Sequence, residues 1–397
     1  MKSKINKANE HIHNLFLQNF LVSTPDNSSK LSEQDLLKLS RIFKKGRSEK
    51  HFVNYLKHKK LTHFSNYKYL KSLSDARTLK SLQIIEASIK ILKLFNSNKI
   101  DCIPLKGAQL IFFYNQSPSI RPMRDLDILI NESQIDDAVR LLLQNGFFFE
   151  SKANIQNDYK SSINKNRYDI EHIVNDQGVC IELHYKIFPK SVCSISKVMW
   201  DNYEKSFIKD IQISRLPPEI LSLHFIYHST TKEGFDVGVQ ALYDLYHIFS
   251  QKDFDFTKLL TISNKVNLLE ETSIFIKIFE KYNKFSFKPE VLNNLYQIDD
   301  GILEECTKLL IINNASNHSI RIFRYGVFNL FKKNFKISTL NGEVFYKKNK
   351  FEYISIFFKR FRRNIYRLIP IFYKLFVDKS FLHDNLKTVQ ILRKIKK

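Results

Sequence analysis

The chain has 397 residues, 43% of them apolar, and a formal net charge of +23 at neutral pH, which predicts a folded protein with one large or several ordinary cores. Lys or Arg interrupts every apolar run before it reaches the roughly 18 to 20 residues of a membrane-spanning helix, and the polar N-terminus resembles no secretory signal. Four widely spaced cysteines argue against a disulfide framework and a structural zinc site, so we expect a cytoplasmic protein.

The N-terminal part of the chain is predicted to be helical. Apolar positions recur at helical spacing between residues 31 and 95. A long helix is expected to begin at the Ser74/Asp75 pair, whose side chains can cap it, and to end near Asn96. We assign residues 1–79 to an N-terminal helical region.

Residues 80–190 are predicted to form a small α+β core of short elements. The turn residues Asn175 to Gly178 indicate a hairpin, and Gly146 supplies a helix stop. The apolar patterns predict strands over residues 100–105, 126–130, 168–174 and 179–185, and helices over residues 107–114 and 133–145.

After Pro189 the pattern is helical again, and we assign residues 191–314 to a second helical region. Pro217-Pro218-Glu219 opens a strongly periodic apolar run, and another helix is expected over residues 239–250. The order of elements therefore predicts a small mixed sheet with helices, flanked by N- and C-terminal helical regions.

Asp125 and Asp127 stand at the start of the apolar strand over residues 126–130. Because side chains alternate along a strand, both carboxylates are expected on the same face. Two carboxylates this close are unfavourable unless a cation lies between them, and hard oxygen ligands suit Mg²⁺ or Mn²⁺. The alternative is a strand end whose carboxylates simply meet water.

Lys106 and Gly107 lie where a predicted strand turns into a predicted helix. The N-terminus of a helix offers free N–H groups and a positive dipole end to a phosphate, and glycine allows close approach. The alternatives are an exposed lysine and an ordinary turn glycine.

Glu182 lies inside the apolar strand over residues 179–185, where burying a carboxylate without a partner is costly. His184, two residues further on, shares its face. The pattern fits a third carboxylate that completes a metal site, or an edge strand whose polar face meets solvent.

Three segments together resemble a little-characterised family of bacterial nucleotidyltransferases in the polymerase-beta-like superfamily. They are Leu105-Lys106-Gly107-Ala108, the run from Arg121 to Ile130, and Ile181-Glu182-Leu183-His184. The resemblance covers roughly residues 80 to 250. The usual Gly-Ser pair of the superfamily is replaced here by Lys106-Gly107.

This resemblance implies a polymerase-beta-like fold, a metal-dependent reaction and roles for particular residues. Asp125, Asp127 and Glu182 would be catalytic and hold Mg²⁺ or Mn²⁺, while Lys106 and the amides around Gly107 would bind the phosphates of an NTP. A nucleoside monophosphate would pass from the NTP to a hydroxyl acceptor, such as a sugar, a small metabolite or a protein, as pyrophosphate leaves.

Other polar residues have weaker claims to a role. Arg121 and Arg124 could neutralise triphosphate charge or form structural ion pairs. His184, His228 and Asp244 could support the site through hydrogen bonds, although a histidine on an apolar helix is more often a core residue.

The segment from Ala315 to Lys397 holds most of the excess charge, with 20 Lys and Arg against 4 Asp and Glu. We assign residues 315–397 to a basic, aromatic-rich helical region. It could lie on an anionic membrane surface, bind nucleic acid, or pack as a helix with a solvated basic face.

Two further functions therefore stay open at this point. One is a catalytically inactive nucleotidyltransferase fold that binds nucleic acid or a membrane through residues 315–397. The other is a toxin-type transferase that modifies tRNA or a partner protein.

Overall fold

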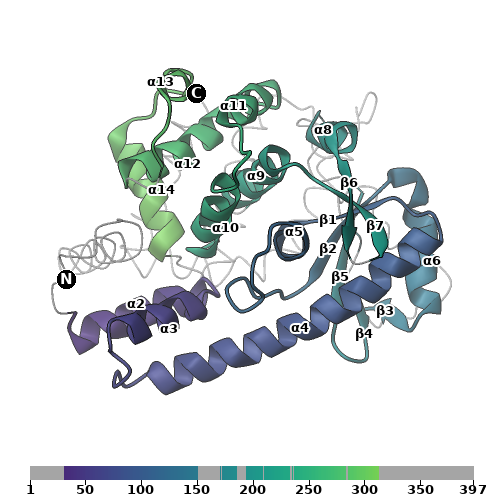
Figure 1. The fold of residues 1–397 in the computed structure, drawn as a ribbon, viewed down its shortest axis with the longest axis horizontal. Coiled ribbons are helices and arrows are strands. Elements are labelled where there is room, and N and C mark those ends of the chain that lie inside the picture. The colour runs from purple at the N-terminus through teal and green to yellow at the C-terminus, as the bar shows by residue number, and fades with distance from the viewer. Residues whose placement is uncertain are drawn as a thin grey trace, which may run out of the picture.

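The structure, a computed structural model, describes residues 31–150, 170, 172–185, 194–208, 210–232, 235, 237–282 and 285–312. The long helix α4 runs from the N-terminal helices α2 and α3 to the sheet, and the C-terminal helices lie on the other side of the molecule (Figure 1). The predicted strand start at Tyr168 and the basic region 315–397 lie outside the described residues.

A five-stranded mixed sheet has the strand order β1-β2-β5-β4-β3. The two central strands β2 and β5 run parallel, and every other neighbouring pair is antiparallel. Parallel neighbours cannot be joined by a tight turn, and the described residues between them include a helix and two further strands. The strands are β1 (Cys102–Pro104), β2 (Leu126–Ile130), β3 (Phe147–Phe149), β4 (Ile173–Asn175) and β5 (Cys180–His184).

Two short helices connect these strands. Helix α5 (Lys106–Phe113) lies between β1 and β2. After β2, the side chain of Asn131 accepts a hydrogen bond from the amide of Ser133 at 3.1 Å and starts the 3-10 turn that leads into α6 (Ile135–Gln144). Gly146, with a φ of +82°, ends this helical segment in the left-handed conformation that glycine favours.

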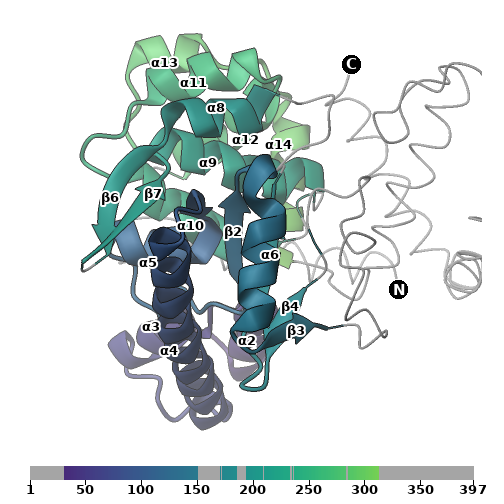
Figure 2. The same ribbon diagram turned by 90° about the vertical axis from the view of Figure 1, so that its right-hand side faces the viewer.

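Helices α4 (Tyr67–Ser97) and α6 cover one face of the sheet (Figures 1 and 2). In β2, Leu126, Ile128 and Ile130 point to this face, as alternation along a strand requires. They pack in one buried cluster with apolar side chains of both helices.

The opposite face of the sheet contributes Ile103, Leu105 and Leu129 to a second, larger core. At the centre of this core lies α9, in which every residue from Glu219 to Tyr227 is buried. The helices that build it are α2 (Glu33–Lys45), α3 (Glu49–His58), α9 (Pro218–Tyr227), α10 (Gln240–Phe249), α11 (Phe256–Lys265), α12 (Leu269–Lys281), α13 (Pro289–Asn293) and α14 (Asp300–Ile312).

The region expected to be helical after Pro189 also contains a β-hairpin. It follows α8 (Ser194–Asn202) and consists of β6 (Glu204–Ile208) and β7 (Ile211–Arg215). Ile211 and Ile213 are buried in the cluster under the sheet while Gln212 is exposed, which is the alternation of a half-buried strand. The expectation of helix throughout this region is therefore wrong for residues 204–215.

The predicted start of the long helix is also wrong. Helix α4 begins at Tyr67, and Ser74 is buried within it. No Gly or Pro interrupts residues 67–97, so the helix continues through the Ser74/Asp75 pair, which is a preferred cap and not an obligatory one. The expected boundary between residues 79 and 80 falls inside α4.

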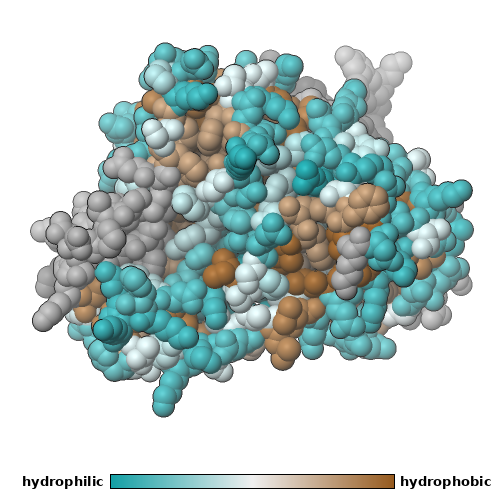
Figure 3. Space-filling model, in the orientation of Figure 1, coloured by the Kyte–Doolittle hydropathy of each residue, from teal (hydrophilic) through white to brown (hydrophobic). Residues whose placement is uncertain are grey.

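The face of the molecule crossed by α4 is mostly hydrophilic, with apolar side chains gathered near its centre (Figure 3). Leu79 and Leu82 of α4 are among the exposed large apolar residues. No helix in the described ranges combines the length and the apolar character needed to cross a bilayer.

The turn between α2 and α3 packs closely against the residue that precedes α10. Gly46 ends α2, and its amide donates to the carbonyl of Ile42 at 2.9 Å. A Cβ atom on Gly46 would lie 2.8 Å from Cγ2 of Val239, which is closer than real Cβ contacts. The turn therefore requires glycine here because of this neighbour, since its φ of −73° is open to any residue.

We expect Gly46→Ala to lower the free energy of unfolding by about 1–3 kcal/mol, because the added methyl group overpacks the contact with Val239. Urea denaturation followed by circular dichroism measures the change. In a Val239→Ala background, where the clashing methyl group is absent, the same substitution should cost clearly less. An equal cost in both backgrounds would show that the contact is not the cause.

Candidate active site

The parallel pairing of β2 and β5 places polar side chains opposite one another. In the register of the two strands, Asp127 pairs with Glu182 and Leu129 pairs with His184. Because side chains alternate, Asp127, Glu182 and His184 all project from the same face of the sheet. All three residues are buried. We call Asp127, Glu182 and His184 the acidic group.

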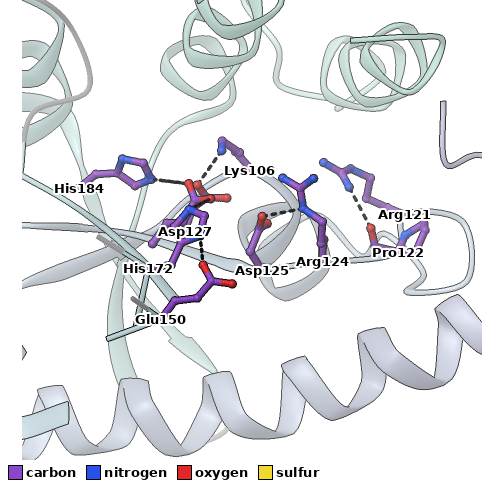
Figure 4. A network of polar contacts seen from close by, with 10 residues as sticks. Lys106, Arg121, Pro122, Arg124, Asp125, Asp127, Glu150, His172 and His184 are labelled. Carbon is purple, nitrogen blue, oxygen red and sulfur yellow. Dashed lines mark hydrogen bonds and ion pairs between the residues drawn. The ribbon is translucent and has the colours of Figure 1, made fainter. Parts of the chain in front are cut away.

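Two cationic or polar side chains converge on the carboxylate of Asp127 (Figure 4). Lys106 Nζ lies 2.6 Å from its Oδ1, and His184 Nε2 lies 2.9 Å from the same oxygen. Burial by itself would raise the pKa of Asp127, but Lys106 and His184 hold the pKa well below its usual value. Asp127 is therefore a buried, ionised carboxylate that depends on its partners.

Lys106 is held in an unusual backbone conformation at the start of α5. Its φ is +47°, in the left-handed region that residues other than glycine seldom adopt. The amide of the preceding Leu105 donates to the carbonyl of Asp127 at 2.9 Å, which fixes the turn to β2. Burial opposes the charge of Lys106, yet Asp127 and then Glu182 raise its pKa above the usual value.

Glu182 lies between two histidines. Its Oε2 is 3.7 Å from His184 Nε2, and its Oε1 is 3.1 Å from His172 Nε2. His172 in turn contacts Glu150 through Nδ1 at 3.0 Å (Figure 4). Burial and the neighbouring charge of Asp127 raise the pKa of Glu182.

The sequence reasoning missed His172. This residue directly precedes β4, and the pairing of Ile173 with Ile181 in the β4–β5 hairpin brings the residue before Ile173 beside Glu182. The hairpin register, once fixed by the turn from Asn175 to Gly178, would have pointed to it.

Asp125 stands apart from the acidic group. It precedes β2, and its Oδ2 lies 3.1 Å from Nε of Arg124, whose side chain is 72% exposed. Its carboxylate is near enough to raise the pKa of both Lys106 and Glu182, but it does not share the close spacing of the three side chains of the acidic group.

Arg121 and Asp244 form an ion pair between the loop before β2 and helix α10. Arg121 Nε lies 2.9 Å from Oδ2 of Asp244. The other oxygen of Asp244, Oδ1, accepts a hydrogen bond from Gln240 Nε2 at 2.9 Å. The guanidinium of Arg121 is 3.6 Å from where a Cβ on Gly107 would stand. The guanidinium of Arg121 thus lies against the start of α5.

His228 is not one of the three side chains of the acidic group. It is half-buried at the start of the π-helical turn His228–Lys232 that follows α9.

The acidic group has the spacing of a cation site. One oxygen or nitrogen from each of its three side chains lies within 4.8 Å of the others. Both contacts to Asp127 end on Oδ1, so among the described residues its Oδ2 has no hydrogen-bond partner. Carboxylate oxygens are the ligands that Mg²⁺ and Mn²⁺ prefer, while an imidazole is more usual for later transition metals. The residues present therefore fit a divalent cation.

Comparison with known proteins supports the class of protein that this fold and site define. The chain has an α+β fold of the nucleotidyltransferase type, with carboxylates on two central strands beside the start of a helix. It belongs to a family described as uncharacterised nucleotidyltransferases, whose sequence model matches residues 33–282. The match extends beyond the sheet to α2, α3 and the helices α9 to α12. No curated protein and no solved structure matches the chain significantly.

We expect Lys106→Met to destabilise the protein at pH 7 by about 3–5 kcal/mol, because it leaves the buried carboxylate of Asp127 without its cation. Chemical denaturation measures this change. The double variant Lys106→Met/Asp127→Asn, which also removes the charge, should recover part of the loss.

The cost of Lys106→Met should also shrink as the pH falls. Without Lys106, burial would raise the pKa of Asp127 in the folded protein above its value in the unfolded chain. The protein then gains stability as the pH falls through that pKa, because the folded state binds a proton that the unfolded state does not. A cost that stays constant from pH 7 to roughly pH 4 would contradict the role given to this ion pair.

Proposed function

We propose that this protein transfers a nucleoside monophosphate from an NTP to a hydroxyl group of an acceptor and releases pyrophosphate. The observation that carries the proposal is the pairing of Asp127 with Glu182 on parallel strands, next to Lys106 at the start of α5. Membership of the nucleotidyltransferase family supports a transferase in general.

The carboxylates would hold Mg²⁺ or Mn²⁺ together with the phosphates of the substrate. Asp127 and Glu182 belong to the acidic group, and Asp125 directly precedes β2, where its side chain is 17% exposed. A bound divalent cation would polarise the α-phosphoryl group and offset the charge that develops on the leaving pyrophosphate.

Lys106 and the backbone around Gly107 would bind the β- and γ-phosphates. The first amides of α5 have no partners within the helix, and the helix dipole favours an anion at this end. Lys106 pairs with Asp127 at 2.6 Å in the free protein, and its ammonium group would also contact a phosphate bound at the start of α5.

The reaction would be an in-line displacement. The acceptor oxygen forms a bond to the α-phosphorus, the bond between that phosphorus and the pyrophosphate oxygen breaks, and the hydroxyl proton passes to a carboxylate. We assign this proton to Glu182, the carboxylate that lies beside Asp127 on the neighbouring strand. Holding the two substrates in line would supply much of the rate.

Of the two arginines, Arg124 is the better partner for the triphosphate. Its side chain is 72% exposed at the edge of the site, whereas Arg121 is held by Asp244 and is 18% exposed. Arg121 would then position the start of α5, and Asp244 would act through Arg121. His184 would orient Asp127 through its hydrogen bond.

The acceptor is proposed only as a hydroxyl compound, such as a sugar, a small metabolite or a protein side chain. A cytoplasmic location stays a prediction. So does contact of residues 315–397 with an anionic membrane surface or nucleic acid, since that region lies outside the described residues.

We expect Asp127→Asn and Glu182→Gln each to reduce Mg²⁺-dependent NTP consumption by at least about a thousandfold, because metal ligation contributes several kcal/mol to such reactions. Pyrophosphate release from a panel of NTPs in a mixture of candidate acceptors measures the activity. Asp137→Asn is the matched control, since Asp137 is exposed on α6 and pairs with Arg140. Undiminished activity in Asp127→Asn would refute the catalytic assignment.

A further inference from the structure

Arg47, in the N-terminal helical pair, lies within electrostatic range of three other guanidinium groups, two of which, those of Arg121 and Arg124, belong to the loop before β2. Arg47 lies in the turn between α2 and α3, within electrostatic range of Arg77, Arg121, Arg124 and the carboxylate of Asp125. The turn is thus near the loop that carries the start of β2, although the two are some 75 residues apart in the sequence.

Three of these four arginines have carboxylate partners. Arg77 pairs with the buried Glu49, Arg121 with Asp244, and Arg124 with Asp125. The fourth, Arg47, is half-buried and has no ion pair or side-chain hydrogen bond within the part of the chain that the structure describes. It is therefore a cation in a crowded position without an anion of its own.

The backbone of the turn is fixed on both sides. Arg77 Nη1 of α4 donates to the carbonyl of Lys44 at 3.4 Å, and Gly46 packs against Val239. Arg47 itself has a φ of +54°, which costs free energy for any residue other than glycine. The fold thus holds an arginine where a glycine would be less strained.

Helix α10 connects this turn to the phosphate-binding end of α5. Gly46 contacts Val239, just before the helix, and His51 of α3 stacks on Tyr243 with ring centroids 3.7 Å apart. The next residue, Asp244, holds Arg121 against Gly107. Five residues of helix span only about 7–8 Å, so the contacts of α10 with the Arg47 turn and with Arg121 lie about that far apart along the helix.

The charge of Arg47 is costly in the free protein. Burial and the positive charges of Arg77, Arg124 and Arg121 lower its pKa to about 10, and the carboxylates of Asp125 and Glu49 offset this only in part. A bound polyanion would relieve this repulsion. A guanidinium also matches phosphate oxygens in a paired, two-point geometry.

We propose that Arg47 binds the terminal phosphates of the nucleotide triphosphate, so that the helical turn before the sheet forms part of the nucleotide site. The inference rests on the proposed function for its substrate. Arg47 then joins Arg124 and Lys106 around the phosphates, on the side of the site that faces α2, α3 and α10.

Inorganic tripolyphosphate tests this without a base or a sugar. Titration calorimetry on the full chain with Mg²⁺ should show roughly ten- to hundredfold weaker binding for Arg47→Gln, the loss typical of one charged hydrogen-bonding group. Arg47→Lys, which keeps the charge, should bind between this variant and the wild type. Arg41→Gln is the matched control, because it removes an exposed arginine from the neighbouring helix α2.

A second readout separates a binding role from a structural one. Without tripolyphosphate, Arg47→Gln should melt at the same or a higher temperature than the wild type, because it removes an unpaired cation. With tripolyphosphate, its melting temperature should rise less than that of the wild type.

Equal tripolyphosphate affinity in the wild type and Arg47→Gln would overturn the inference, as would an equal loss in Arg47→Gln and Arg41→Gln. If Arg47→Gln loses affinity while Asp127→Asn keeps full NTP consumption, the phosphate site stands and the catalytic proposal fails. If Asp127→Asn loses activity while Arg47→Gln binds normally, only the role of Arg47 is refuted.

Discussion

The structure around the sheet depends on one buried negative charge, the carboxylate of Asp127. Isolated in an apolar core, an ionised carboxylate is too costly to keep, so Lys106 and His184 must both be in place on the same oxygen. Lys106 reaches Asp127 from a strained turn, and His184 reaches it only because β5 runs parallel to β2 in one register. A register shift of one residue would turn Glu182 and His184 to the opposite face and leave Asp127 with one partner.

Much of this arrangement follows from the sequence. The apolar run of residues 126–130 predicts the strand β2. The apolar run that ends at Leu105 predicts a strand, so a helix is expected to start just after it, at Lys106-Gly107. The apolar patterns predicted the α+β core, the resemblance of these segments predicted the family, and the match over residues 33–282 confirms the family. The apolar periodicity alone could not predict that Asp127 and Glu182 lie side by side, because it does not show that their strands are parallel neighbours.

What the sequence did not reveal depends on contacts between distant segments. The ion pair of Arg121 with Asp244 joins residues 123 positions apart, and neither residue type nor spacing indicates which carboxylate an arginine will choose. His172 acquires its place from hairpin register, and Asp125 is drawn toward Arg124 although strand alternation alone would group it with Asp127. The hairpin of β6 and β7 was overlooked because its alternation is short and lies between two helices.

Helix α4 carries the N-terminal helices at one end and the sheet at the other. At about 1.5 Å per residue its 31 residues form a rod roughly 46 Å long. Arg77 of α4 donates to the carbonyl of Lys44 beside the α2–α3 turn and pairs with Glu49 of α3. One turn further along α4, Ser81 accepts a hydrogen bond from the amide of Met123 at 3.0 Å. Helix α4 contains no Gly or Pro, the residues at which helices most often bend sharply. The α2–α3 turn and the loop before β2 are therefore held at a fixed distance from each other, and neither can shift without the other.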